Sequence, residues 1–520
     1  MEKTAVNLNP DATIGVVGVC GINGNLIARI LAEHGYKVIV NDIVSKEKCR
    51  FRDALKGYSF YEEYYGHLPD EFFEKIDYIV LPLALVENNS EIYQKALKEN
   101  IKLLQVEDIL NIFEPARPVI CVTGTNGKTT TTNIIKSLAY YSNKKPCEHN
   151  LEGMQGNAGD IPALQSRLKG DLNILETGTF GIKGSLTKLA KPCKPDVGII
   201  TNITPDHLDE NSTFLDYARV KGELIALLNN KTLIANNDDP TVMSLIRELN
   251  YEGNLITFGI EHKSIRRDTK QCICGEQIIV DEIIAGVGKY ECSCGNKYRK
   301  PDYIAADIND SHNRFTLVTP YGEEVRFTLQ INGIHNIYNA LGSIIVAHEI
   351  LDMSYDDIKQ PLMSFTGVKG RMEKIGKIAD KQVMVDYAHN PAGITTVLKE
   401  LKNLYDTVVN VITTSSESGI TGDMEILERA VEYADYVVPA SHNAFICAKK
   451  ACDEGQFRDK IVLPENMPEG DKKGTLGATI EQVMTGFNKA KGIDADLLVL
   501  TGEAAFKFKD YLIDEIKNSS

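Results

Sequence analysis

The sequence has no apolar run long enough to span a membrane, and its first residues form no apolar signal segment. It also has no excess of basic residues, since 57 Lys and Arg against 72 Asp and Glu give a formal net charge of −15. A nucleic-acid-binding protein needs a basic surface, so that class is excluded, although a local basic pocket can still bind an anionic substrate. Internal repeats and low-complexity tracts are absent as well. We therefore expect a cytoplasmic globular protein that neither enters a membrane nor binds nucleic acid.

The chain has 520 residues, 43% of them hydrophobic. That length suits about three domains with sizeable cores. Eleven cysteines are present, and seven of them are scattered singly. We interpret these seven as reduced, mostly buried thiols of a cytosolic protein. The other four cysteines form two close pairs.

A predicted strand, loop and helix around residue 125 carry the strongest functional signal. The β-branched run from Val119 to Val122 leads into Thr123 and then Gly124-Thr125-Asn126-Gly127-Lys128-Thr129-Thr130, where a helix begins. Glycines let the loop turn its N–H groups inward, and the helix N-terminus adds partial positive charge. Lys128 can reach the outer phosphates, and a hydroxyl of Thr129 or Thr130 can bind Mg²⁺. The pattern predicts a nucleoside triphosphate site rather than an ordinary turn.

Residues 1–115 predict a Rossmann-like domain. A strand from Thr13, a glycine-rich turn, a helix from Asn25 and a second strand ending near Val40 form its βαβ opening. The glycines are spaced G-x-x-G-x-x-G instead of G-x-G-x-x-G, which favours a nucleotide sugar or another phosphate-bearing substrate over NAD. Gly21 and Asn23 in the turn are candidate substrate-binding residues.

Residues 116–370 predict a central ATP-binding domain built on a mostly parallel sheet. Two of its strands end in polar groups, one at Glu176 and the other in Thr201-Asn202-Ile203-Thr204-Pro205-Asp206-His207. Ligands of open α/β sheets lie off the carboxyl ends of strands, so both ends should face the triphosphate loop. Glu176 suits Mg²⁺, although a helix-capping carboxylate is the alternative.

Two cysteine pairs lie in an insert at about residues 265–302. Cys272-Ile273-Cys274-Gly275 and Cys292-Ser293-Cys294-Gly295 each place a glycine after the second cysteine. Four thiolates at this spacing suit tetrahedral Zn²⁺ in a small structural ribbon. Each pair is separated by one residue instead of the usual two, so disulfides or free thiols are alternatives.

Residues 371–520 alternate strands and helices again and predict a second Rossmann-like domain. Polar groups follow its strands, among them Asp386 and His389. The glycine-rich linker of residues 365–373, which leads into this domain, contains Arg371, whose guanidinium suits a phosphate. The sequence thus predicts an α/β protein of three domains, with a small Cys₄ ribbon inserted in the middle one.

Five segments, in this order, resemble motifs of the Mur ligases, the ATP-dependent amide-bond ligases that build the murein peptide. They are Gly124 to Thr129, Thr201 to Asp209, Gly333-Ile334-His335-Asn336, Gly370-Arg371-Met372-Glu373 and Asp386 to Pro391. The N-terminal domain is more loosely similar to the nucleotide-sugar-binding domain of the family. The cysteine insert resembles the ribbon of MurT, the amidating Mur-like subunit. A full N-terminal domain combined with this ribbon is most similar to the pseudomurein peptide ligases of methanogenic archaea.

The resemblance implies that a substrate carboxylate takes the γ-phosphoryl group of ATP and that an amine then attacks the acyl phosphate. Positioning and charge neutralisation carry most of such phosphoryl transfer. The expected cofactors are ATP, two Mg²⁺ ions, structural Zn²⁺ and CO₂ bound as a lysine carbamate. By analogy, the loop amides and Lys128 bind the phosphates, Thr129 and Glu176 bind one Mg²⁺, and His207 and carbamylated Lys221 bind the second. Asn336 and Asn339 are expected to contact adenine, Arg371 and Asp386 to contact phosphate and ribose, and His389 to contact the substrate. Without this match, Lys221 would be taken for a surface lysine.

The expected partners are a nucleotide-linked peptide precursor and an amino acid, and we expect a monomer. Residues 440–445 lack the arginine with which some murein ligases bind a diamino acid, so the amine stays open. One alternative is an amidotransferase subunit that takes ammonia from a glutaminase partner, but such relatives lack the N-terminal domain. Two others are a Mur-like ligase or cyclase of methanogen tetrapyrrole coenzyme synthesis and a catalytically inactive ATP-binding scaffold.

Overall fold

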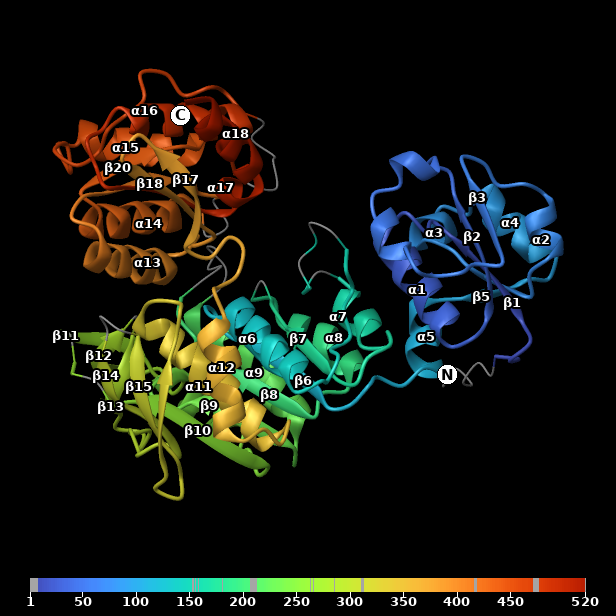
Figure 1. The fold of residues 1–520 in the computed structure, drawn as a ribbon, viewed down its shortest axis with the longest axis horizontal. Helices are drawn as coiled ribbons and strands as arrows, with labels where there is room; N and C mark the ends of the chain where they lie inside the picture. Colours follow the sequence, from blue (N-terminus) through green and yellow to red (C-terminus); the bar gives the residue numbers. More distant parts are fainter. Residues whose placement is uncertain are drawn as a thin grey trace.

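The computed structural model describes residues 8–519, except residues 152, 153, 155, 158, 180, 206–212, 262, 265, 285, 310–312, 416–418 and 471–476. Three α/β domains follow one another along the chain, each built on its own sheet (Figure 1). The N-terminal domain, in blue, and the C-terminal domain, in orange and red, lie on different sides of the middle domain. The predicted three-domain fold is therefore confirmed. None of the helices that the structure describes combines the length and the apolarity that a membrane span requires.

The N-terminal sheet is parallel, with the strand order β3-β2-β1-β4-β5. Its strands are β1 (Thr13–Val17), β2 (Lys37–Asp42), β3 (Glu62–Tyr65), β4 (Tyr78–Val80) and β5 (Lys102–Leu104). One face is covered by α1 (Ile22–Glu33) and α5 (Val106–Ile112), and the other by α2 (Glu71–Glu74) and α4 (Glu91–Lys98). Helix α1 follows the glycine-rich turn directly, as a Rossmann-like unit requires.

The middle sheet has the order β16-β15-β14-β10-β9-β8-β6-β7 and is antiparallel only at its β14-β15-β16 end. Its strands are β6 (Val119–Thr123), β7 (Asn173–Glu176), β8 (Val197–Ile200), β9 (Thr232–Asn236), β10 (Asn254–Ile260), β14 (Tyr303–Asn309), β15 (Arg314–Val318) and β16 (Glu324–Thr328). Helices α6 (Lys128–Tyr141), α11 (Ile334–Glu349) and α12 (Tyr355–Ser364) cover one face, while α7 (Ile161–Gln165), α8 (Ser185–Ala190), α9 (Phe214–Leu228) and α10 (Pro240–Glu248) cover the other. Because both faces are covered, every residue of β6 is buried, which explains its unbroken apolar run.

The cysteine insert, which lies between β10 and β14 in the sequence, forms a separate antiparallel sheet. Its strands are β11 (Arg266–Gln271), β12 (Gln277–Ile284) and β13 (Val287–Glu291), in the order β11-β12-β13. The two cysteine turns follow β11 and β13, so they lie at the same end of the sheet.

The C-terminal sheet has the order β17-β18-β21-β19-β20, with β17 antiparallel at one edge. Its strands are β17 (Glu373–Ile378), β18 (Lys381–Asp386), β19 (Val408–Ile412), β20 (Tyr436–Pro439) and β21 (Leu497–Thr501). Helices α13 (Pro391–Leu404), α14 (Gly419–Tyr433) and α15 (His442–Asp453) pack on one face, and α16 (Ile480–Lys491), α17 (Glu503–Lys507) and α18 (Lys509–Ser519) pack on the other.

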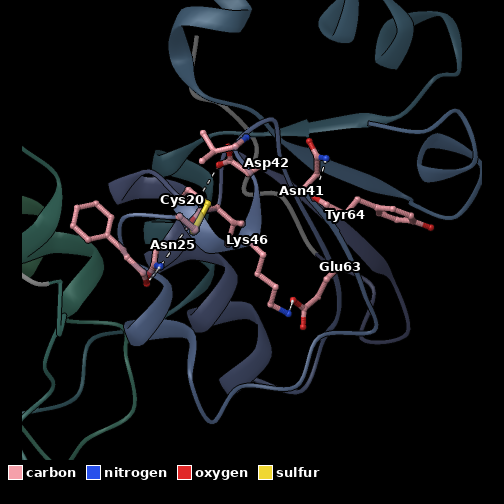
Figure 2. Close-up of a disulfide and its surroundings, with 11 residues drawn as sticks. Cys20, Asn25, Asn41, Asp42, Lys46, Glu63 and Tyr64 are labelled. Atoms are coloured by element: carbon pink, nitrogen blue, oxygen red, sulfur yellow. Dashed lines mark hydrogen bonds and ion pairs between the residues drawn. A yellow bond between two sulfur atoms is a disulfide. The ribbon is translucent and has the colours of Figure 1, made fainter. Parts of the chain in front are cut away.

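Two of the seven single cysteines are not free thiols. Cys20, in the turn after β1, and Cys49, which follows β2, form a disulfide (Figure 2). Adjacent parallel strands bring both segments to the same edge of the sheet, where the two Cα atoms are 5.0 Å apart. The N–H of Cys20 donates to the Asp42 carboxylate at 2.8 Å, which holds the turn against the end of β2. The expectation of a reduced thiol was wrong for this pair, while the other five are free and mostly buried.

Candidate functional site

The loop of residues 124–130, here called the phosphate loop, requires glycine at two positions. Gly124 (φ +141°) and Gly127 (φ +84°) both have positive φ. A Cβ atom at Gly124 would lie 2.0 Å from Thr201 Oγ1, and one at Gly127 would lie 2.3 Å from Asn339 Oδ1. The loop is therefore packed between the end of β8 and helix α11, with its last residues forming the N-terminus of α6.

The segment after β8 holds the phosphate loop in place. The Asn202 side chain accepts a hydrogen bond from the Asn126 N–H at 3.1 Å and donates one to the Asn126 carbonyl at 3.0 Å. The Asn202 carbonyl accepts from the Thr125 N–H at 2.8 Å, and Thr201 Oγ1 donates to the Asn126 carbonyl at 2.6 Å. These bonds hold the loop backbone against the segment that follows β8.

A cavity of about 550 Å³ opens beside the phosphate loop, between the middle and C-terminal domains. Eight residues that the sequence predicts for nucleotide binding line it: Asn126, Gly127, Thr129, Thr130, Asn336, Asn339, Arg371 and Asp386. Lys128 begins α6, and its Nζ donates to the Thr125 carbonyl at 2.7 Å. The structure thus brings together predicted residues from segments more than 200 positions apart, around a space that suits a nucleotide.

Side-chain amides connect the start of α11 to the phosphate loop. Asn339 Oδ1 accepts a hydrogen bond from Thr131 Oγ1 at 3.3 Å, and its Nδ2 donates to Asn336 Oδ1 at 3.0 Å. Asn336 Nδ2 donates in turn to the Asn332 carbonyl at 2.6 Å. His335 also lines the cavity, and its Nδ1 has no hydrogen-bond partner among the described residues. Burial lowers the pKa of His335 to about 4, so the ring is neutral at pH 7.

Arg371 and Asp386 bring the C-terminal domain into the cavity wall. The Asp386 carboxylate accepts hydrogen bonds from the N–H groups of Met372 and Ala388, each at 2.7 Å. Burial raises the pKa of this carboxyl, and the charge of Arg371 and the two N–H groups oppose that effect. The Arg371 guanidinium lies 4.9 Å from the centroid of the Tyr387 ring. A rigid, polar wall therefore faces the phosphate loop.

The C-terminal domain also touches the phosphate loop directly. Asn390, which caps α13, donates from Nδ2 to Asn126 Oδ1 at 3.5 Å. His389 precedes it, and its Nδ1 lies 2.9 Å from the Tyr387 carbonyl oxygen. His389 is not among the residues that line the cavity, although Ala388 beside it is.

The residues predicted to bind Mg²⁺ lie around the same loop, as far as the structure describes them. Glu176 ends β7, the neighbour of β6, and its Oε1 accepts a hydrogen bond from Asn157 Nδ2 at 3.3 Å. Lys221, on α9, is 1% exposed, so the interpretation as a surface lysine was wrong. Its Nζ lies 5.1 Å from the centroid of the Tyr217 ring, and the Tyr217 hydroxyl is 3.1 Å from Thr125 Oγ1. His207 lies outside the described residues.

Gly21 and Asn23, the predicted substrate residues, lie at the start of α1 in the N-terminal domain. The Asn23 amide donates to the Asp160 carboxylate of the middle domain at 2.9 Å. Neither residue lines the nucleotide cavity. The two residues predicted to bind substrate therefore lie on a different domain from the phosphate loop.

The sequence predicts no role for the Asn202 side chain and, taken without the family resemblance, only helix capping for the His335 ring. Both lie inside quoted motifs, and both line the cavity. Their positions were the available signal, because Asn202 follows the buried strand β8 and His335 is the second residue of α11, next to Asn336.

The four paired cysteines form one compact cluster. All four Sγ atoms lie within 4.8 Å of one another, and the pairs Cys272–Cys294 and Cys274–Cys292 are 3.7 and 3.6 Å apart. Tetrahedral Zn²⁺ with bonds of about 2.3 Å places its sulfur ligands about 3.8 Å apart. The alternative of disulfides was wrong, since all four are free, and the donor set fits a closed structural metal site.

Known protein families match the two domains whose residues line the cavity. Residues 122–347 match the family model of the Mur ligase middle domain, and residues 370–502 match that of the Mur ligase, glutamate ligase domain. A UDP-N-acetylmuramate–L-alanine ligase from Clostridium kluyveri is 31% identical over 391 residues, covering 74% of each chain. The structure of a pseudomurein peptide ligase type C from Methanothermus fervidus is similar with a TM-score of 0.84 and 34% identity, over 97% of this chain and 100% of that one. The chain therefore belongs to the Mur ligase family, whose members are ATP-dependent, ADP-forming ligases.

Proposed function

We propose that this ligase joins a nucleotide-linked peptide precursor to an amino acid in the synthesis of a pseudomurein-type cell-wall peptide. The similarity to the Methanothermus pseudomurein peptide ligase over nearly the whole chain supports this substrate class. The observation that carries the proposal is the cavity in which the phosphate loop of the middle domain meets Arg371 and Asp386 of the C-terminal domain. Because ATP is a cytoplasmic substrate, the reaction is assigned to the cytoplasm.

In the proposed reaction, a carboxylate oxygen of the precursor attacks the γ-phosphorus of ATP, and ADP leaves. The amine then attacks the acyl carbon of the resulting acyl phosphate, loses a proton and expels inorganic phosphate. The phosphate-loop N–H groups and Lys128 bind the β- and γ-phosphates, while Arg371 neutralises charge from the opposite wall. Such charge neutralisation and positioning supply most of the rate enhancement in phosphoryl transfer.

Mg²⁺ bound here would neutralise charge between the triphosphate and the carboxylate, which otherwise repel each other. We assign Thr129 and Glu176 to one ion, and His207 with Lys221 to the second. A protonated lysine has no lone pair for that second cation, whereas a carbamate formed from its neutral amine and CO₂ would offer the anionic oxygen ligand that Mg²⁺ prefers. The burial of Lys221 on a helix that contacts Thr125 through Tyr217 supports this assignment. Activity that falls in CO₂-free buffer and returns with bicarbonate would be the expected sign of the carbamate.

The proposed function is tested by measuring ATP-dependent phosphate release over a panel of nucleotide-linked precursors and L-amino acids. Release is expected only when an acid and an amino acid are both present, with ADP as the second product. Lys128→Ala should lower the rate of phosphate release by about 100-fold or more, because an essential contact with the ATP phosphates is lost. Lys359→Ala, which removes an exposed lysine on α12, is the matched control and should match the wild type.

Other outcomes of this panel would overturn the proposal. Phosphate release with ammonia alone would assign the chain to the amidotransferase class, and release only with tetrapyrrole acids would assign it to coenzyme synthesis. No release with any pair, although ATP binds, would leave an ATP-binding scaffold.

A further inference from the structure

The cysteine ribbon contacts the nucleotide site through a buried ion pair. Lys270, the fifth residue of β11, places Nζ 2.7 Å from Oδ1 of Asp239. The two side chains are only 6% and 0% exposed, so water does not screen this pair as it screens a surface one. A second buried carboxylate, Glu282 on β12, adds to the attraction on Lys270.

Asp239 uses its other oxygen to hold the segment that supports the phosphate loop. Its Oδ2 accepts a hydrogen bond from the Ile203 N–H at 2.7 Å, while Oδ1 also accepts from the Thr241 N–H at 2.9 Å at the start of α10. Ile203 follows Asn202, whose side chain makes both hydrogen bonds to the Asn126 backbone. An unbroken series of charged and polar contacts thus leads from the ribbon to the phosphate loop.

The ribbon makes further contacts with the same region. The N–H of Gly288 donates to the Asp238 carbonyl at 2.8 Å, and the Tyr290 hydroxyl donates to the Asn237 carbonyl at 3.3 Å. Ile284 and Val287, where β12 meets β13, line the nucleotide cavity itself. The ribbon is therefore packed against residues 237–239 and forms one wall of the cavity.

We propose that Lys270 is a positioning residue through which the ribbon orders the nucleotide site. Its ammonium group pairs with the Asp239 carboxylate, and this buried pair keeps the backbone after β8 fixed through the hydrogen bond from the Ile203 N–H. The segment 201–205 then holds the phosphate loop in the shape that binds ATP, and it leads directly to His207. Loss of a single partner from a buried ion pair leaves an uncompensated charge, which the segment can relieve only by moving toward water.

The test compares Lys270→Met with Arg267→Met in the full-length, zinc-loaded protein. Arg267 lies on the same strand but pairs with Asp281 on the surface, where its side chain is 79% exposed. We expect Lys270→Met to raise the rate of amide hydrogen exchange in residues 201–204, and the dissociation constant of a non-hydrolysable ATP analogue, each by about tenfold or more. Arg267→Met should leave both within about twofold, as surface pairs contribute little.

A second variant covers the case in which Lys270→Met does not fold. Lys270→Met combined with Asp239→Asn removes both charges of this pair, and the single amide oxygen can accept from only one of the Ile203 and Thr241 N–H groups, more weakly than a carboxylate does. This double variant should fold, and its amide hydrogen-exchange rate after β8 should be higher than that of the wild type but lower than that expected for Lys270→Met. Unchanged exchange and unchanged nucleotide affinity in a folded Lys270 variant would overturn the proposal. Exchange and binding need no turnover, so this result is distinguishable from failure of the proposed ligase function.

Discussion

Replacing Asn202 by alanine should weaken ATP binding by a calculable amount. The side chain makes two hydrogen bonds to the backbone of Asn126, at 3.1 and 3.0 Å, in a half-buried position. Each such bond contributes a net ~1 kcal/mol, so their loss frees the phosphate loop at a cost of ~2 kcal/mol. Since 1.4 kcal/mol corresponds to a factor of ten, the dissociation constant of ATP should rise about 30-fold.

Isothermal titration calorimetry with ATP, ADP and adenosine would measure this effect. Asn202 supports the phosphate loop, so the affinities for ATP and ADP should fall while the affinity for adenosine stays the same. Asn254→Ala is the control, because Asn254 is an exposed asparagine at the opposite, amino-terminal end of β10. A folded Asn202→Ala protein whose ATP affinity is within about twofold of the wild type would refute the reasoning, because two lost hydrogen bonds should cost more than that.

Three more predictions concern the rest of the molecule. Burial raises the pKa of Asp238 to about 7, above its unfolded value of 3.8, so the folded state binds more protons between these values. The free energy of unfolding should therefore fall by up to ~4 kcal/mol as pH rises from about 4 to about 7, and Asp238→Asn should abolish this fall. Urea unfolding at pH 5 and pH 7.5 measures it, and the same difference in free energy between the two pH values in both proteins would contradict the prediction. The full-length protein should contain about one zinc per chain and lose it in Cys272→Ser but not in Cys452→Ser, and equal zinc in both variants would contradict the metal site. Without reductant, nine of the eleven cysteines should react with a thiol reagent after denaturation and chelation; eleven would contradict the Cys20–Cys49 disulfide.

The parts of the fold set by neighbouring residues were predictable from the sequence. The phosphate loop is an example, since a buried β-branched strand, two glycines and a helix start are contiguous and each has its own local signal. The ribbon turns are another, because a glycine after each cysteine pair provides the positive φ that the turn needs, +96° at Gly275 and +86° at Gly295.

Contacts between distant segments were not predictable in the same way. The Cys20–Cys49 bond depends on β1 and β2 lying side by side, and the positions of single cysteines in the sequence do not show which strands are neighbours. The Lys270–Asp239 pair joins an inserted sheet to the residue that caps α10, and nothing in the spacing of the two residues indicates it. Lys221 was assigned from family resemblance alone, and its burial depends on how α9 packs against the middle sheet.

The central claim is that this protein activates a carboxylate as an acyl phosphate. The most direct measurement is the fate of ¹⁸O placed in the acceptor carboxylate during a reaction with ATP and the amino acid. The account predicts that one labelled oxygen appears in each inorganic phosphate released, because the bond from that oxygen to carbon breaks when the amine attacks. Inorganic phosphate without the label, formed together with the amide product, would contradict it.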